Sequence, residues 1–304
     1  MAVRLGVNPI GWTNDDLVEL GDEIPLEVCL GEAREAGYEG IELGRKFPRR
    51  AAELRPILDR HGLALVSGWY GAELLTHSAK EEIASLQDHR ALLLDMGSTV
   101  MVFAEVSGAV HGERGVPLSR RPTLTDDAAW RRFGERLTEV AEHLRACGLR
   151  LAYHHHMGTV VETEAEIDRL MATTGEAVGL LLDTGHLTYA GGDIAGVARR
   201  HARRLVHVHA KDVRPPVLAD ARRQDSSFLD AVVAGVFTVP GDGGVDYPAL
   251  LEVLKTAGYT GWLVVEAEQD PAVAPPLTYA RMGWRHLRET AAAVGLSLST
   301  PRSG

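Results

Sequence analysis

Imidazole and carboxylate side chains recur in the second half of the chain, each set at the end of a short apolar run. The ionisable residues at the ends of these runs are His154, His155, His156, Asp183, His186, His207, His209, Lys211, Asp212, Glu266 and Glu268. Mixed imidazole and carboxylate donors suit a divalent transition ion such as Mn²⁺, Co²⁺, Fe²⁺ or Zn²⁺ better than an all-oxygen site for Mg²⁺ or Ca²⁺. The pattern therefore predicts a divalent metal centre.

The period of two in a strand sharpens this prediction. It places His154 and His156 on one face and His155 on the other, and it pairs Glu266 with Glu268 on a shared face. Each motif alone is weak, because HVH in a strand is often a structural pair and DTGH is often a turn with an Asx hydrogen bond. Four such motifs at consecutive strand ends favour a metal site over these structural roles.

Eight β-rich runs alternate with helical patterns along the chain, and this alternation explains how the motifs come together. The expected strands are 3–7, 40–43, 63–67, 99–104, 149–153, 179–182, 205–208 and 262–265. Strict alternation implies parallel strands with right-handed crossovers, and eight units close as a barrel. The fold class is therefore α/β, a single (β/α)₈ TIM barrel, and no GxGxxG loop follows the first run to favour an open dinucleotide-binding sheet.

Helical periodicity and stop signals predict the connecting helices at 25–37, 51–62, 79–96, 125–147, 163–173, 193–203, 247–257 and from 277 onwards. A segment at about 212–246, after the seventh strand, interrupts the rhythm as an insertion. The chain is expected to form one domain over 1–304, with a frayed tail after about 295. Active sites of such barrels lie at the carboxyl ends of the strands, which also carry Asn8, Glu42 and Glu105.

Composition narrows the function classes. The 304 residues include 32 Lys and Arg against 42 Asp and Glu, a net charge of −10, which opposes a nucleic-acid partner. No signal-peptide pattern and no run of about 18 apolar residues is present, so a cytoplasmic protein without a membrane partner is expected. Two cysteines, Cys29 and Cys147, are too few for a disulfide framework.

Several motifs carry a family resemblance that spans about residues 3–290. They are NPIGWTNDD, ELGRKFPR, LVSGWYGAELLT, AYHHHMGTVVET, LLDTGHLTYAGGD, HVHAKDVRP, GVFTVPGDGGVD and GWLVVEAEQDPA. Together they resemble the inosose dehydratases of inositol catabolism, within the xylose-isomerase-like superfamily of metal-dependent TIM barrels.

The resemblance implies a metal held by one residue from each of strands five to eight, usually Glu, Asp, His and Glu. Asp183, His209 and Glu266 match the last three positions. The first position departs from the pattern, because His154 stands where the superfamily has Glu. This leaves three alternatives: His154 as the ligand, His156 as the ligand, or three protein ligands plus water.

The implied reaction is the dehydration of scyllo-inosose, a polyhydroxylated cyclohexanone, to a dione through an enol. The resemblance implies Mn²⁺ or Co²⁺, and it alone suggests glutathione as an additional cofactor. The expected partner is this small polyol ketone. Barrels of this type often form dimers or tetramers, which leaves homo-oligomerisation open.

Four residues are candidates for proton transfer. Glu266 is expected to serve as both ligand and base, as corresponding glutamates do in related epimerases, and Lys211 to assist enolate formation or to hold a substrate hydroxyl. The alternative for Lys211 is a rim ion pair with Asp212. His156 and His186 are candidates for protonating the leaving hydroxide.

The remaining candidates are expected to contact the substrate. Trp12, Trp69 and Tyr70 offer apolar faces to the C–H surface of the ring, with packing in the core or rim as the alternative. Arg214 is expected to hydrogen-bond substrate hydroxyls, and Glu162 is a weaker base candidate near the substrate.

Three other functions remain open at this stage. A metal-dependent sugar or keto-polyol isomerase or epimerase would share the barrel, the metal and the enolate, but would return the proton instead of expelling hydroxide. An endonuclease of the same superfamily would need a richer histidine set and a basic face. A barrel that only binds would not need Asp183, His209 and Glu266 together.

Overall fold

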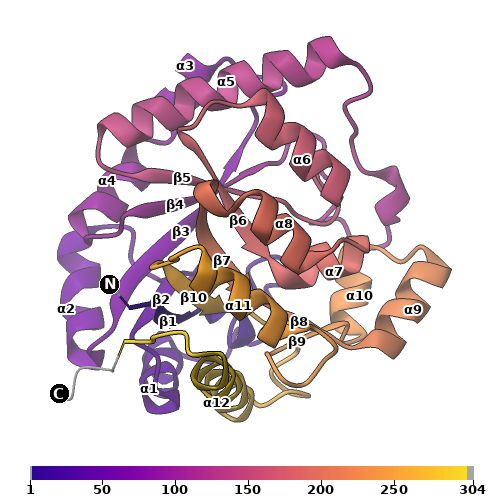
Figure 1. Cartoon of the computed structure of the whole chain (residues 1–304). Coiled ribbons are helices and arrows are strands. Elements are labelled where there is room, and N and C mark those ends of the chain that lie inside the picture. Colours follow the sequence, from indigo (N-terminus) through magenta and orange to yellow (C-terminus); the bar gives the residue numbers. More distant parts are fainter. Residues whose placement is uncertain (1, 300–304) are drawn as a thin grey trace.

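Eight parallel strands close into a barrel at the centre of the molecule (Figure 1), in a computed structural model that describes residues 2–299. In order around the barrel the strands are β1 (Arg4–Val7), β2 (Gly40–Leu43), β3 (Ala64–Ala72), β4 (Val100–Glu105), β5 (Arg150–His154), β6 (Val178–Asp183), β7 (Leu205–Ala210) and β10 (Trp262–Val265). The last strand pairs with the first, which confirms the predicted (β/α)₈ barrel.

The strand boundaries follow the prediction closely, with one consequential exception. β2 and β10 have the predicted bounds, and most other strands differ by one or two residues. β3, however, continues past Ser67 to Ala72. Trp69 and Tyr70 therefore lie within a strand and point to opposite faces of it.

The helices lie outside the barrel (Figure 1). They are α1 (Leu26–Ala36), α2 (Ala51–His61), α3 (Ala79–Ser85), α4 (Gln87–Asp95), α5 (Asp127–Ala146), α6 (Glu164–Thr173), α7 (Thr184–Ala190), α8 (Ile194–Arg200), α9 (Pro215–Gln224), α10 (Phe228–Val233), α11 (Tyr247–Thr256) and α12 (Pro276–Val294). The helix expected over 79–96 is two helices, because Leu86 at φ −80° and ψ 0° interrupts it. Short 3₁₀ turns occupy Pro9–Gly11, Leu118–Arg120 and Ala202–Arg204.

The helix α5 shows why these segments pack as they do. Asp126 caps its first turn by accepting a hydrogen bond from the Ala129 amide. Trp130, Phe133 and Leu137 then recur at helical spacing, and all three are buried. This apolar stripe faces the main core, which fills the space between helices and strands.

Small and branched side chains fill the inside of the barrel. Val102, Ala152 and Leu181 belong to one buried cluster there, and Val66 packs with Trp262 in another. Gly40 is needed beside this tryptophan, because a Cβ at that position would lie 2.7 Å from the Trp262 ring and 2.6 Å from Val66. The packed interior leaves the carboxyl ends of the strands as the place for chemistry.

The insertion after β7 folds back on itself. Two short strands, β8 (Asp212–Val213) and β9 (Phe237–Thr238), pair antiparallel and enclose α9 and α10. The Asp212 carboxylate holds the base of this segment by accepting hydrogen bonds from three backbone amides, those of Val213, Gly241 and Val245.

The chain end is tied to the first strand as far as the structure describes it. Leu298 forms a β-bridge with Val3, and the Ser299 amide donates to the Val3 carbonyl. Residues 296–299 are therefore held, contrary to the expected fraying after 295, and the rest of that segment, 300–304, lies outside the described residues.

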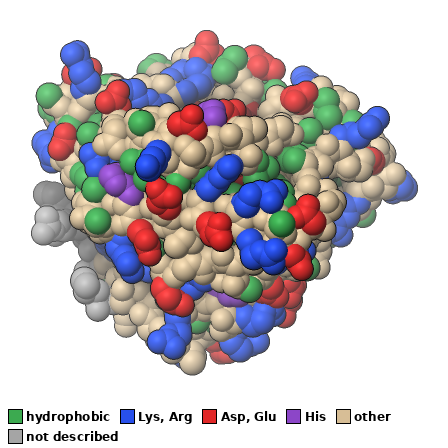
Figure 2. Space-filling model, turned by 90° about the horizontal axis from the view of Figure 1, so that it is seen from above, with side chains coloured by type: hydrophobic (Ala, Val, Ile, Leu, Met, Phe, Trp, Pro, Cys, Tyr) green, Lys and Arg blue, Asp and Glu red, His purple; other side chains and the backbone are tan. Residues whose placement is uncertain are grey.

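Two further observations concern the distribution of surface charge and the length and polarity of the helices. On the face shown in Figure 2, Lys and Arg side chains are interspersed with Asp and Glu. No helix within residues 2–299 is long and apolar enough to cross a membrane.

Candidate metal centre and active site

Four metal-ligand side chains converge at the carboxyl ends of neighbouring strands. His154 ends β5, Asp183 ends β6, His209 lies in β7 and Glu266 follows β10 directly. One donor atom from each lies within 4.8 Å of the others. Parallel pairing produces this arrangement, since Asp183 is in register with His209.

The distances between these donor atoms are close to those between neighbouring ligands of one metal ion. His154 Nε2 lies 3.2 Å from His209 Nδ1 and 3.7 Å from Asp183 Oδ2. His209 Nδ1 lies 2.9 Å from Glu266 Oε2. Ligand bonds of about 2.1 Å separate neighbouring donors by roughly 3.0–3.4 Å, so one ion is well matched to the space between them.

Two buried atoms in this cluster present lone pairs to the space between the four side chains. His154 Nδ1 donates to the His155 carbonyl at 2.7 Å, so Nε2 carries the lone pair and faces His209 Nδ1 within the cluster. Burial and the neighbouring His209 hold the pKa of His154 well below its usual range, so the ring is neutral. Asp183 Oδ1 accepts from the His186 amide, whereas the buried Oδ2 has no hydrogen-bond partner among the described residues. Both atoms fit metal ligands.

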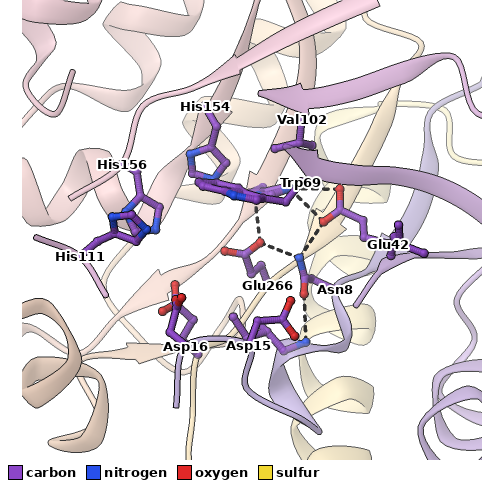
Figure 3. Close-up of a pocket in the computed structure, with 14 residues that line it drawn as sticks. Asn8, Asp15, Asp16, Glu42, Trp69, Val102, His111, His154, His156 and Glu266 are labelled. Atoms are coloured by element: carbon purple, nitrogen blue, oxygen red, sulfur yellow. Dashed lines mark hydrogen bonds and ion pairs between the residues drawn. The ribbon is translucent and has the colours of Figure 1, made fainter. Parts of the chain in front are cut away.

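A hydrogen-bonded layer orients the ligands from behind. His209 Nε2 lies 3.1 Å from Glu42, whose carboxylate also contacts His207 at 2.9 Å. The Asn8 amide donates to Glu42 at 2.8 Å and to Glu266 at 3.0 Å, and Figure 3 shows it between the two carboxylates. Such outer partners fix ring orientation and ligand basicity at metal sites.

The charges around the cluster favour a cation. Burial would lower the pKa of His209, but the carboxylates of Glu266 and Glu42 raise it well above its usual value. Burial would likewise raise the pKa of Glu42, yet His209 and His207 hold it below the usual range. The ionised carboxylates thus create a negative field at the place where a divalent ion would lie.

Lys211 occupies a second position beside the cluster. Its ammonium lies 2.5 Å from Glu266 Oε1 and from Glu268 Oε1, and 3.1 Å from His186 Nε2. Burial would lower the pKa of Lys211, but nearby carboxylates, Asp183 first among them, raise it, so the side chain is charged. It makes no rim ion pair with Asp212, which is occupied by backbone amides.

A cavity opens over the cluster (Figure 3). It is lined by Asn8, Ile10, Asp15, Asp16, Glu42, Leu43, Trp69, Val102, His111, His154, His156, His209, Glu266 and Glu268. Trp69 forms one wall and stands edge-on to the rings of His154 and His156. The cavity therefore combines an apolar surface with polar groups beside the cluster.

The comparisons with known proteins agree with the barrel fold. Residues 30–290 match the family model of the xylose isomerase-like TIM barrel. The chain belongs to this family. It is 52% identical over 300 residues, covering 99% of this chain and 92% of the relative, to the rhizopine catabolism protein MocC of Rhizobium meliloti. It is 44% identical to an inosose dehydratase of Geobacillus thermodenitrificans, covering 95% and 97% of the two chains.

A solved structure extends the agreement on the fold. The structure of an L-ribulose 3-epimerase superposes with a TM-score of 0.67 and 18% identity, over 97% of this chain and 96% of that one. At this identity the similarity concerns the xylose isomerase-like barrel itself.

The four residues predicted to transfer protons do not all reach the cavity. Glu266 and His156 line the cavity, whereas Lys211 and His186 are fully buried behind them. Of the two histidines left open for the fifth strand, His154 joins Asp183, His209 and Glu266, and His156 groups with His186 and Glu268.

Two aromatic residues expected to contact substrate do not line this cavity. Tyr70 points away from Trp69 because the strand continues through both, and its hydroxyl donates to Glu82 at 2.6 Å. Trp12 follows the 3₁₀ turn Pro9–Gly11, which directs it toward α1, where its indole N–H donates to Glu32 at 2.7 Å. Of the three predicted aromatic contacts, Trp69 remains.

Two charged residues are also placed elsewhere. The Arg214 guanidinium pairs with Asp242 at 2.7 Å and donates to the carbonyls of Gly235 and Phe237, so it secures the insertion. Glu162 accepts from the Gly158 amide and lies 3.4 Å from Arg121, in a separate surface depression. Neither reaches the cavity.

Several cavity residues had no role in the sequence-based assignment. Asn8, Glu42 and Glu268 stand at strand ends, so the barrel prediction contained their signal. Asp15, Asp16 and His111 come from loops without regular periodicity. Their convergence depends on loop geometry, and no local pattern indicated it.

Proposed function

We propose that this protein is a metal-dependent dehydratase that removes water from scyllo-inosose. The observation that carries the proposal is the cluster of His154, Asp183, His209 and Glu266, whose donor atoms meet beside the cavity. The 44% identity to an inosose dehydratase, over 95% of this chain, supports the choice of substrate and of reaction. In this reaction a C–H proton next to the ketone and a hydroxyl on the following carbon leave as water, and the resulting enol tautomerises to a dione.

The cluster would hold a divalent ion, which lowers the cost of removing the α-proton by polarising the ketone oxygen. Asn8 keeps the Glu266 carboxylate oriented, and Glu42 keeps the His209 ring oriented. The wall formed by Trp69 offers an apolar surface for the C–H face of the ring. Nitrogen and oxygen donors suit Mn²⁺ or Co²⁺, the ions that the resemblance implies.

His156 is the best-placed group for proton transfer. Its Nδ1–H donates to the Met157 carbonyl at 2.8 Å, which leaves Nε2 unprotonated in a ring that lines the cavity. This nitrogen can accept the α-proton and return it to the departing hydroxyl. Glu266, by contrast, is engaged on both oxygens, by Lys211 and by Asn8 and His209. We therefore assign Glu266 to metal binding and His156 to the base.

The test is turnover of scyllo-inosose by protein stripped of metal and reloaded with Mn²⁺ or Co²⁺. Formation of the dione, followed by its ultraviolet absorbance, is the expected result. Exchange of the α-proton with solvent deuterium and no loss of water would instead identify an isomerase or epimerase. Inactivity toward scyllo-inosose with every ion would reject the proposed substrate.

A role in rhizopine catabolism is the second candidate, since the relative with 52% identity carries that name. The two relatives align over nearly the whole chain, so either role would use the same cavity. Comparing kcat/KM for scyllo-inosose with that for ketones prepared from rhizopine decides between them.

A further inference from the structure

The ammonium of Lys211 is held between two carboxylates beside the cluster. Its Nζ lies 2.5 Å from Glu266 Oε1 and from Glu268 Oε1, 3.1 Å from His186 Nε2 and 3.6 Å from Asp183 Oδ2. Two of the three N–H donors of the ammonium are therefore taken by carboxylate oxygens. The side chain is fully buried and does not line the cavity, which argues against the substrate-contacting role expected from the sequence.

Two of the groups around this ammonium, His186 and Glu268, belong to a second set of metal-ligand residue types. His156, His186 and Glu268 each offer a donor atom within 4.8 Å of the others, and all three are buried. Glu266 joins this second set to the first, because Oε1 contacts Lys211 and Oε2 faces His209. A carboxylate shared between two cation positions is the arrangement of two-metal centres.

The surrounding chain is shaped to hold the lysine in this place. A Cβ at position 185 would lie 2.5 Å from Lys211 Cγ, so Gly185 in the DTGH motif provides room for the stem. From the insertion, the Phe237 ring lies 4.9 Å from the ammonium and Phe228 packs edge-on against His156. The Phe237 ring thus favours a fixed cation at this position.

We propose that the Lys211 ammonium is a built-in cation that fills a latent second metal site, formed by His156, His186 and Glu268, and so keeps the centre mononuclear. This inference rests on the proposed metal site formed by His154, Asp183, His209 and Glu266. Lys211 is then a positioning residue: it holds Glu266 toward the ion and leaves His156 free of metal for proton transfer.

The test counts bound Mn²⁺ in chelator-stripped protein after incubation with excess Mn²⁺ and removal of unbound ion. The wild-type protein is expected to hold one ion per chain. Lys211→Ala is expected to hold two, with the spin-coupled electron paramagnetic resonance signal of neighbouring ions. Lys211→Ala combined with Glu268→Ala should return to one. A folded Lys211→Ala protein that holds one ion overturns the inference.

Two further proteins keep the test decisive even where Lys211→Ala does not fold. Glu268→Gln is nearly isosteric and should keep the single ion, because Glu268 belongs to the second set. Loss of that ion would overturn the division of these residues into two separate cation sites. Lys255→Ala is the matched control, since Lys255 is a surface lysine bound to the Val294 carbonyl, and it should hold one ion.

The wild-type count separates this inference from the proposed function. Two ions in the wild-type protein would overturn the role of Lys211 and leave the metal-dependent function standing. No ion in the wild-type protein would refute the proposed metal site and, with it, this inference.

Discussion

The strand ends of the barrel and the loops around them obtain their side-chain positions in different ways. At β5, β6, β7 and β10, strand register alone brings His154, Asp183, His209 and Glu266 together. In the surrounding loops, Arg214 and Glu162 bind other loop atoms and do not reach the cavity. The comparison teaches that strand ends position the chemistry and that many polar loop residues hold the loops.

The largest effect is expected for Asp183→Asn. The amide keeps an acceptor for the His186 amide, so the cap of α7 survives, while the unpartnered Oδ2 is replaced by a nitrogen that cannot ligate. Loss of a Lewis acid removes several kcal/mol of stabilisation, which corresponds to about a thousandfold or more in kcat. Metal analysis and turnover of scyllo-inosose check this.

Asp246→Asn is the matched control, because Asp246 caps α11 away from the cluster and should leave metal content and rate unchanged. Near-normal metal content in Asp183→Asn would show that Asp183, at the end of β6, is not a metal ligand.

A smaller but diagnostic difference is expected between adjacent histidines. His154→Ala should weaken metal binding by at least about a hundredfold, since it deletes a ligand. His155→Ala should keep the metal and lower the unfolding free energy by about 1–3 kcal/mol, because His155 Nε2 accepts the buried Asp183 amide. Metal titration and thermal unfolding measure the two effects. If His156→Ala strips the metal and His154→Ala does not, the assignment of β5 is wrong.

The comparison also shows how far the sequence could predict the molecule. The apolar runs that alternate with helical patterns predicted the eight strands. The four strand ends that carry the cluster residues could be predicted as well, because strands that follow one another in the sequence are neighbours in the barrel and their carboxyl ends lie together. The grouping of His154, and not His156, with the other three residues was not predictable from the sequence, since it depends on β5 ending at His154 and the chain turning after it.

The substrate contacts were harder to predict for physical reasons. Tyr70 was misplaced because β3 continues beyond Ser67, and a few extra strand residues decide which face a side chain takes. Trp12 and Arg214 were misplaced because loop side chains respond to partners far away in sequence, Glu32 and Asp242. Asp16 and His111 meet at the cavity for the same reason.

Among the residues at the strand ends, Asn8→Ala should have an intermediate effect on metal affinity. It removes the amide that orients both Glu42 and Glu266 without removing a ligand. Loss of such an outer partner typically costs about 10–100-fold in metal affinity or activity. Isothermal titration with Mn²⁺ measures the affinity, and an unchanged dissociation constant would show that the ligands orient themselves.

The smallest effect on catalysis is expected on the loop side, for Arg214→Ala. Its hydrogen bonds to Gly235, Phe237 and Asp242 are lost from a partly exposed site, so we expect about 1–2 kcal/mol less stability. KM for scyllo-inosose should stay within about threefold, since the side chain does not line the cavity. A KM increase far beyond this with normal stability would return Arg214 to the substrate site.

The proposed dependence of turnover on a metal ion in the cluster is tested most directly by treating the unmodified protein with a chelator. After chelation, the account predicts an unchanged far-ultraviolet circular dichroism spectrum, because the barrel core is complete without metal. It also predicts no turnover of scyllo-inosose, and recovery on addition of one equivalent of Mn²⁺ or Co²⁺ per chain. Full turnover by the chelated protein, or its complete unfolding, would contradict the account.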